Sequence, residues 1–273
     1  MTQGTSEGAD ESKKRQLIKE IFEGLRAIDK RSDILPFNNE TVKEVSTRVR
    51  FRNPFDATKF NTYESLPECL KQEGFIVVHL GRGNHAFVRG VGFHNFEPVQ
   101  QSKPWSLSNS IVSKLGNSEA DTVSTIYNEK IIHDFLFGNV TNNLKIHNSR
   151  RSNITYDFWI GKNQLHADYL QIEMDALFES KDTIATVEVK NVKHANFEIR
   201  QLYSTFRYLD RFYRDGVIPS NFNIRHLFVI VSKGAREAFY RIYEYTFTNW
   251  KHMDSIKLVK NAQYNVAKER SLF

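Results

Sequence analysis

Hydrophobic residues recur every three to four positions over 13–29, which places them along one face of a helix. The same spacing predicts two shorter helices, at 38–50 with Asn39 as a candidate N-cap and at 63–74. Two apolar runs then flank a glycine-containing turn and predict a β-hairpin over 75–90. Helices followed by a hairpin are typical of a winged helix, a module that often contacts DNA. A small dimerisation or packing domain with solvated arginines is the alternative.

The second half of the chain contains both kinds of periodicity. Alternating apolar and polar positions, or short continuous apolar runs, predict strands. Apolar positions at three- and four-residue spacing predict helices, the first of which ends at Gly138. This order favours a mixed β-sheet flanked by helices, in the α/β (α+β) class. The expected helices are 119–137, 197–214 and 235–247, and the expected strands are 143–147, 154–161, 168–178, 183–191, 226–232 and 255–259.

Segments of biased composition divide the chain into two units. Residues 1–11 are mostly small, polar or acidic, and we expect them to be disordered. Residues 99–118 are rich in Ser, Asn, Gln and Pro, a composition that suits a linker. The sequence therefore predicts a smaller helical, winged-helix-like unit at 12–98, for DNA binding or dimerisation, and a larger unit at 119–273.

Composition and charge narrow the class of protein. No run of roughly 18 apolar residues occurs, so we do not expect a membrane protein. The single cysteine, Cys69, cannot form an internal disulfide, and the polar N-terminus lacks the apolar core of a secretory signal. We therefore expect a cytoplasmic protein. A formal net charge of +6 and a pI of about 9.2 make a polyanion a plausible partner.

Acidic residues occur on two neighbouring predicted strands. In "LQIEMDALF" Glu173 and Asp175 share one face, and in "TIATVEVKN" Glu188 and Lys190 share one face, because strand side chains alternate. The short "ESKD" connection predicts a hairpin that sets Asp175 opposite Thr186 and Glu173 opposite Glu188. Facing carboxylates are destabilising unless a cation lies between them, and oxygen ligands without His or Cys favour Mg²⁺.

An arginine-rich helix follows these strands. Arg200, Arg207, Arg211 and Arg214 are spaced so that they form one stripe, which suits a polyanion held by its phosphates. A solvated helix face is the alternative for this stripe. The acidic residues likewise have a second interpretation, a solvated sheet edge with a cross-strand ion pair.

The pattern "IEMD…TVEVKN…EIRQLYSTFRYL" resembles the PD-(D/E)xK nuclease superfamily, and within it type II restriction endonucleases with a helical or winged-helix region before the nuclease core. The resemblance covers about residues 119–232 and implies a restriction-endonuclease-like sheet there. Met174 stands where the nominal motif has proline. The implied roles are Asp175, Glu188 and Lys190 as catalytic residues, Asp175, Glu188 and Glu173 as metal ligands, and Gln201 and Glu129 as supporting residues.

Such an enzyme cuts double-stranded DNA at a specific sequence, with Mg²⁺ or its substitute Mn²⁺, and leaves 5′-phosphate and 3′-hydroxyl ends. The resemblance also implies a bacterial or archaeal cell, and a homodimer in which each subunit cuts one strand. No nucleotide cofactor is expected, because the glycines of the hairpin lack the Lys-Ser/Thr of a phosphate-binding loop. Two alternatives stay open: another nuclease of this superfamily, for repair or junction cleavage, and a non-enzymatic DNA-binding regulator. The residues expected to contact DNA are Arg82, Asn84, His85, Lys193, His194, Asn196, Arg200 and Arg207.

Overall fold

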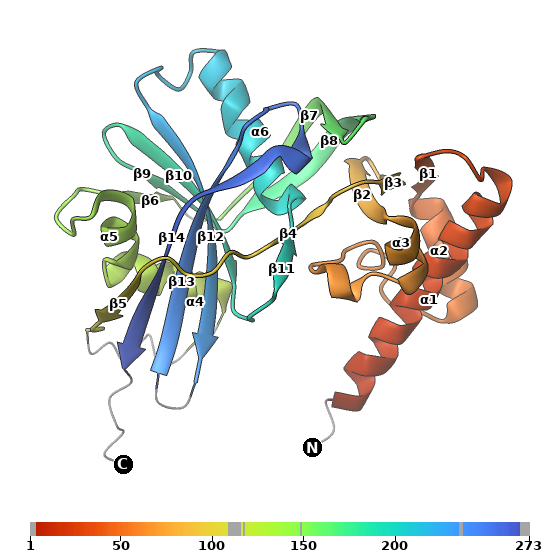
Figure 1. Ribbon diagram of the computed structural model, residues 1–273, viewed down its shortest axis with the longest axis horizontal. Coiled ribbons are helices and arrows are strands. Elements are labelled where there is room, and N and C mark those ends of the chain that lie inside the picture. The colour runs from red at the N-terminus through yellow and green to blue at the C-terminus, as the bar shows by residue number, and fades with distance from the viewer. Residues whose placement is uncertain (1–3, 109–115, 117, 148, 235–236, 268–273) are drawn as a thin grey trace.

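Figure 1 shows the computed structural model of the chain, in which an N-terminal helical unit lies beside a larger unit built on strands. The structure describes residues 4–108, 116, 118–147, 149–234 and 237–267. Helices are combined with a mixed main sheet, which confirms the α+β class expected from the sequence.

The N-terminal unit consists of helices packed on a small antiparallel sheet. Its elements follow the order helix, strand, helix, helix, strand, strand, and the strands lie in the order β1-β3-β2. This is the element order of a winged helix, and the β2–β3 hairpin is the one expected from the two apolar runs. The bounds are α1 Gly4–Ile28, β1 Ile34–Asn38, α2 Asn39–Val49, α3 Glu68–Glu73, β2 Phe75–Gly81 and β3 Asn84–Arg89.

Helix α1 is longer than the sequence predicted. It begins at Gly4, so the expectation of a disordered tail over 1–11 is wrong for its described residues, whereas 1–3 lie outside the described part of the chain. An ion pair four residues apart, between Glu11 and Arg15 at 3.6 Å, supports the early turns.

Helix α2 is capped by Asn38 and not by Asn39. The Oδ1 of Asn38 accepts the backbone N–H groups of Glu40 and Thr41 at 3.1 and 3.0 Å. Asn39 is therefore the first helical residue, and its Oδ1 lies 2.8 Å from Nε2 of His85 in the hairpin.

Within the described residues, the larger unit contains a seven-stranded sheet with the order β5-β14-β13-β12-β10-β9-β6. Strands β10 and β12 run parallel and are joined through α6, whereas β9, β13 and β14 pair antiparallel with their neighbours toward the centre. A helix that connects two parallel strands must cross one face of the sheet. The bounds are β4 Phe93–Asn95, β5 Ser102–Trp105, α4 Glu119–Asn128, α5 Ile131–Phe137, β6 Lys145–His147, β7 Arg150–Ile160, β8 Asn163–Met174, β9 Ala176–Glu179, β10 Thr183–Lys190, β11 Asn196–Glu198, α6 Arg200–Arg214, β12 Asn223–Lys233, β13 Glu237–Phe247 and β14 Ile256–Ala267.

Strand β10 shows how the two faces of the sheet are used. Ala185, Val187 and Val189 are buried in the core formed with α4 and α5. The opposite face is covered by α6, and Glu188 and Lys190 lie on that face at the end of the strand. The apolar residues of β10 therefore lie in the core, and its two charged residues lie beside α6.

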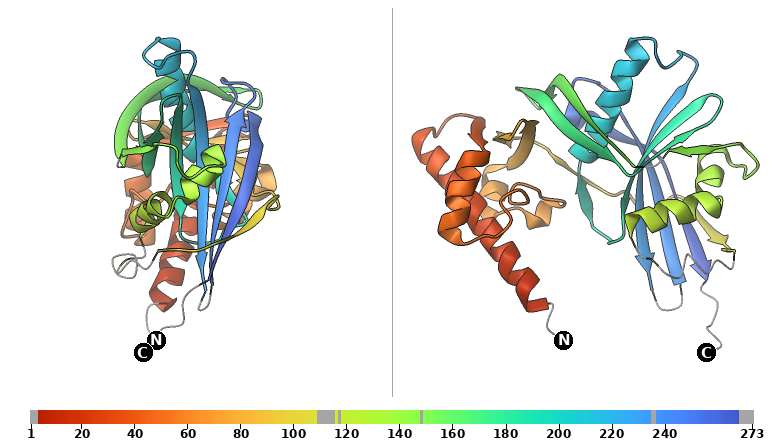
Figure 2. Two further views of the ribbon diagram at one scale, coloured as in Figure 1. Left: turned by 90° about the vertical axis from the view of Figure 1, so that its left-hand side faces the viewer. Right: turned by 180° about the vertical axis from the view of Figure 1, so that it is seen from behind.

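The two units meet where the β2–β3 hairpin approaches β8. Figure 2 shows the long β7–β8 hairpin reaching toward the N-terminal unit. Gly81 has φ +87°, and a Cβ there would lie 2.0 Å from the backbone oxygen of Asp168. Only glycine permits this backbone contact, so Gly81 fixes the hairpin against β8.

Two predicted helices begin or end differently. The helix expected at 119–137 is divided into α4 and α5, because Lys130 adopts a left-handed conformation with φ 60°. Gly138 ends α5, as expected. The helix expected at 197–214 starts only at Arg200, since the preceding residues form β11.

The helix expected at 235–247 is instead strand β13, with 235–236 outside the described residues. Tyr240 and Ile242 are buried on one face of the sheet, and Tyr243 and Tyr245 are buried on the other. Because both faces are covered, apolar and aromatic residues run almost continuously along the strand. Such a run cannot be distinguished from a buried helix by periodicity alone.

The segment between the units is not a free linker over its described residues. β4 pairs with β11, and β5 lies parallel to β14 at the edge of the main sheet. Residues 93–105 therefore belong to the larger unit, although 12–98 and 99–118 were expected to be domain and linker. The part of 99–118 at 109–115 and 117 lies outside the described residues.

Candidate functional site

The register of β9 and β10 decides which carboxylates face each other. Phe178 pairs with Ala185 and not with Thr183, so the expected register is wrong by two residues. Continuing this ladder brings Asp175, and not Glu173, opposite Glu188. Because strand side chains alternate with a period of two, a shift of two residues still leaves Asp175 on the same face as Glu188.

Asp175 lies in the short break between β8 and β9. Its Oδ2 accepts the backbone N–H of Val189 at 2.7 Å, and this bond ties the carboxylate to β10 between Glu188 and Lys190. The two halves of the sequence motif are therefore joined by a direct hydrogen bond.

Lys190 lies at the centre of the charged cluster. Its Nζ is 2.9 Å from Oε1 of Glu188 and 2.9 Å from Oε1 of Glu119, and it donates to the carbonyl of Val189 at 2.9 Å. Gln201, at the start of α6, donates from Nε2 to Oε1 of Glu188 at 3.0 Å. The structure thus brings Asp175, Glu188, Lys190 and Gln201 together, as the sequence predicted.

The negative charges of the carboxyls in this cluster are only partly balanced by the one ammonium, that of Lys190. Burial raises the pKa of Glu188 to about 7, although Lys190 acts in the opposite direction. Burial also raises the pKa of Asp175, against the N–H of Val189. Burial disfavours the ammonium of Lys190, but Glu188 and Glu119 outweigh this effect and raise its pKa. Three carboxyls share one ammonium, and a further cation would stabilise the cluster.

Glu119 is the residue that the sequence prediction missed. It is the first residue of α4. The expected supporting acid, Glu129, lies at the other end of that helix, where its carboxylate accepts hydrogen bonds from the N–H and Oγ of Ser108 at 2.7 and 2.5 Å. Ser118 and Asp121 form a capping box at the start of α4. This Ser, followed three residues later by an acid, agrees with the helix start expected at 119, but it does not indicate that Glu119 contacts Lys190.

Glu173 has a different environment from the one predicted. Its Oε1 lies 2.6 Å from Nε of Arg151 on β7 and accepts from Gln171 Nε2 at 3.2 Å. With 56% of its side chain exposed, Glu173 lines the same cavity but is already paired with a cation.

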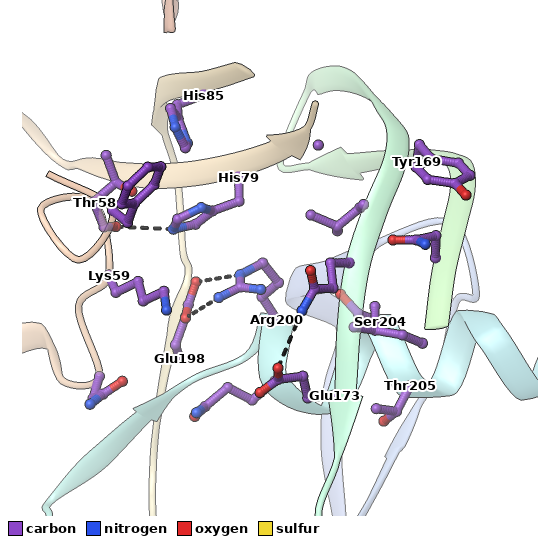
Figure 3. Close-up of a pocket in the computed structure, with 18 of the residues that line it drawn as sticks. Thr58, Lys59, His79, His85, Tyr169, Glu173, Glu198, Arg200, Ser204 and Thr205 are labelled. Atoms are coloured by element: carbon purple, nitrogen blue, oxygen red, sulfur yellow. Dashed lines mark hydrogen bonds and ion pairs between the residues drawn. The ribbon is translucent and has the colours of Figure 1, made fainter. Parts of the chain in front are cut away.

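The cluster lies in a cavity of about 850 Å³ between the two units. Figure 3 shows Thr58, Lys59, His79 and His85 on the side of the N-terminal unit, facing Arg200 and Glu198 of the larger unit. Asp175, Glu188, Lys190 and Gln201 also line this cavity. The N-terminal unit is therefore part of the wall of the site.

The residues expected to contact DNA divide into two groups. Arg82 and Asn84 are exposed at the hairpin turn and line the cavity. Arg200 lines it too, but its guanidinium makes a double hydrogen bond with Glu198 at 2.8 and 3.0 Å. His85 is buried at 6% exposure, and its pKa is lowered by burial to about 4, so it belongs to the wall and not to the surface.

Other candidates are engaged elsewhere. Arg207 is only 8% exposed, stacks on Trp250 and donates to the carbonyl of Asp157, so the expected arginine stripe is wrong at this position. The reason is that α6 packs against β7 as well as against the main sheet. Asn196 is also buried, where it bonds Tyr63 N and the carboxylate of Glu64. Lys193 and His194 lie on the connection after β10 and do not line the cavity.

The donor set of the cluster fits a hard cation. Asp175 and Glu188 offer carboxylate oxygens and Val189 offers its carbonyl, which are the ligand types that Mg²⁺ and Mn²⁺ accept. Among the described residues, no three His, Cys, Asp or Glu side chains are already arranged around one metal position. The fit therefore rests on the chemistry of the donors and on the excess of carboxyls over cations.

None of the described helices is both long and apolar enough to pass through a bilayer. Comparisons with curated proteins and with solved structures find no match. A family described as domain of unknown function (DUF6996) matches residues 15–87, which correspond to the N-terminal unit. A second, described as domain of unknown function (DUF6997), matches residues 89–265. This second match spans well over half of the chain and includes every residue of the charged cluster, whereas the wall contributed by the N-terminal unit lies outside it. The chain therefore belongs to the DUF6997 family.

Proposed function

We propose that the protein is a Mg²⁺-dependent endonuclease that hydrolyses phosphodiester bonds of double-stranded DNA, in the manner of type II restriction endonucleases. The observation that carries this proposal is the convergence of Asp175, Glu188 and Lys190 in one cavity between the two units. A solvated sheet edge, the alternative interpretation, does not account for a Glu188 side chain that is only 13% exposed and whose pKa is raised to about 7.

Each residue of the cluster has a role in this reaction. Asp175 and Glu188 would hold Mg²⁺ or Mn²⁺, which lowers the pKa of water and shields the phosphate when it is bound. Lys190 orients the attacking water and offsets the charge that grows on the phosphate. Gln201 holds the carboxylate of Glu188, and Glu119 holds the ammonium of Lys190.

The reaction is the addition of water to a phosphodiester. The water oxygen forms a bond to phosphorus, the bond from phosphorus to the 3′ oxygen breaks, and the 3′ oxygen takes up a proton. The products carry 5′-phosphate and 3′-hydroxyl ends, as the resemblance implies. A homodimer acting in the cytoplasm, with one subunit for each strand, is the form that we propose for this activity.

The position of the N-terminal unit supports a DNA substrate. Its hairpin turn presents Arg82 and Asn84 to the cavity, and Lys59 lies on the same side. Arginine, lysine and asparagine are side chains that bind phosphates and the edges of bases. A chain with a formal net charge of +6 would also attract DNA over longer distances.

The experiment that tests the proposal separates cleavage from binding. Purified protein is incubated with plasmid DNA in Mg²⁺, and binding to a labelled plasmid fragment is measured in EDTA and in Ca²⁺. We expect discrete cleavage in Mg²⁺, none in EDTA, and binding without cleavage in Ca²⁺. Full binding in EDTA with intact DNA in Mg²⁺ would favour the DNA-binding regulator. Cleavage restricted to branched or damaged DNA would favour the repair nuclease.

A further inference from the structure

Two aromatic rings are exposed in the cavity. The side chain of Tyr169 on β8 is 58% exposed, and Phe55 of the N-terminal unit is 67% exposed, yet both line the same cavity as the charged cluster. Each ring has a cation beside it. The guanidinium carbon of Arg82 lies 5.6 Å from the centre of the Tyr169 ring, and Nζ of Lys43 lies 5.9 Å from that of Phe55.

Tyr169 is held in an unfavourable backbone conformation. Its φ of 53° is left-handed, a region that bulky residues rarely enter. The register of the β7–β8 hairpin shifts between Ile154 and Tyr156, and the N–H of Tyr169 donates to Oγ1 of Thr155 at 3.0 Å. This bulge sets the direction of the ring, and Figure 3 shows Tyr169 across the cavity from Thr58 and Lys59.

Arg82 is also held in a left-handed conformation, with φ 47°. It pairs with Asp168 at 2.9 Å, directly beside the point where Gly81 touches β8. Tyr169 and Arg82, which come from different units, therefore both adopt an energetically unfavourable backbone conformation at the same contact. They present an aromatic ring and a cation to the same cavity.

A simpler explanation is that the rings of Tyr169 and Phe55 serve only the packing of the two units. It accounts poorly for the solvent exposure of both rings. A ring that served packing would be buried, whereas Tyr169 and Phe55 each keep more than half of their surface accessible. A flat ring with an adjacent cation suits a ligand that has both a π-face and a negative charge. A nucleotide has both, and stacking on aromatic side chains is a main source of affinity for bases that are not paired.

We propose that Tyr169 is a stacking residue for a nucleobase that has left the helical stack, with Arg82 contacting its phosphate and Phe55 as a second platform on the facing wall. Bases inside an intact duplex have both faces covered, so only an unstacked base can offer its face to the ring. This inference rests on the proposed DNA substrate and adds to it a preference for locally opened DNA.

The experiment compares two duplexes of one sequence, one fully paired and one with two unpaired nucleotides, of which one is 2-aminopurine. Binding is measured by fluorescence anisotropy in Ca²⁺, and stacking by quenching of the 2-aminopurine emission. We expect the wild-type chain to bind the opened duplex more tightly, by about tenfold, and to quench its fluorescence. Tyr169→Ala should lose the preference and the quenching, whereas Tyr169→Phe should keep both.

Two further variants control for folding and for aromatic content. Tyr169→Gly suits the left-handed φ, so its melting temperature should not fall below that of Tyr169→Ala, yet it too should lose the preference. Tyr213→Ala removes a tyrosine that is 38% exposed on α6 and does not line the cavity, and it should behave as wild type.

The outcomes distinguish this inference from the proposed function. If the wild-type chain binds neither duplex, the DNA substrate is wrong and the stacking role fails with it. If the wild-type chain binds DNA but Tyr169→Ala keeps the preference and the quenching, the stacking role alone is overturned.

Discussion

Replacing Glu119 by glutamine tests the part of the site that only the structure reveals. The substitution keeps the shape of the side chain but removes a charge that lies 2.9 Å from Nζ of Lys190. At an effective dielectric constant of about 20, unit charges at this distance attract by about 6 kcal/mol. Glu119 is 43% exposed, however, so solvent screening and lost side-chain freedom reduce the net interaction to about 1 kcal/mol.

We expect this loss to appear in the rate of cleavage. Without the charge of Glu119, Lys190 keeps Glu188 and the carbonyl of Val189 but is held less firmly. If about 1 kcal/mol is lost only in the transition state, kcat falls by about fivefold while KM for DNA is unchanged. The assay is the initial rate of plasmid linearisation in Mg²⁺ over a range of DNA concentrations.

Glu129→Gln is the matched control, because Glu129 lies at the opposite end of the same helix and bonds Ser108. It should leave both kcat and KM unchanged. Wild-type kinetics for Glu119→Gln, or an equal slowing by Glu129→Gln, would refute the role given to Glu119. A fall in KM with kcat unchanged would show that Glu119 acts on the DNA by repulsion and not through Lys190.

Three further results are expected. Lys190→Ala should reduce cleavage by on the order of 10² to 10⁴, because it removes the group that we propose orients the water. A gel shift in Ca²⁺ should show that DNA binding survives. Asp175→Asn should abolish cleavage, whereas Glu173→Gln should retain it, because of these two acids only Asp175 is hydrogen-bonded to β10, through the N–H of Val189. Similar activities of the two variants in the plasmid assay would contradict the observed register. Buried His226 has its pKa lowered by burial to about 3, and in the unfolded chain it titrates near 6.5, so the unfolded state binds more protons between these values. The free energy of unfolding should therefore fall as the pH is lowered through this window, by up to about 1.4 kcal/mol per pH unit for this residue, and urea titrations should show a shallower dependence for His226→Gln.

The proximity of Asp175, Glu188 and Lys190 could be predicted because it depends on local rules. Glu188 and Lys190 share a strand face by alternation alone, and Asp175 stays on the matching face even though the register is wrong by two residues. An error of one residue would have separated the carboxyls. The prediction that the three side chains share a face was therefore correct, although the loop length assumed for the hairpin gave the wrong register.

The remaining errors concern tertiary contacts between helices and strands. The periodicity of a sequence does not specify these contacts. Arg207 looks solvent-exposed by helical spacing, but α6 is covered on a second side by β7 and Trp250. Strand β13 looks helical because both of its faces are buried. Glu119 reaches Lys190 across a sequence separation of 71 residues, a contact that no local spacing could indicate.

The central claim is tested most directly by digesting supercoiled plasmid with the purified chain in Mg²⁺ and sequencing the ends of the products. If Asp175, Glu188 and Lys190 form a nuclease centre, the plasmid yields discrete fragments whose ends carry 5′-phosphates and share one short sequence. If the plasmid stays supercoiled in Mg²⁺ and in Mn²⁺, or if Asp175→Asn yields the same fragments, the claim is contradicted.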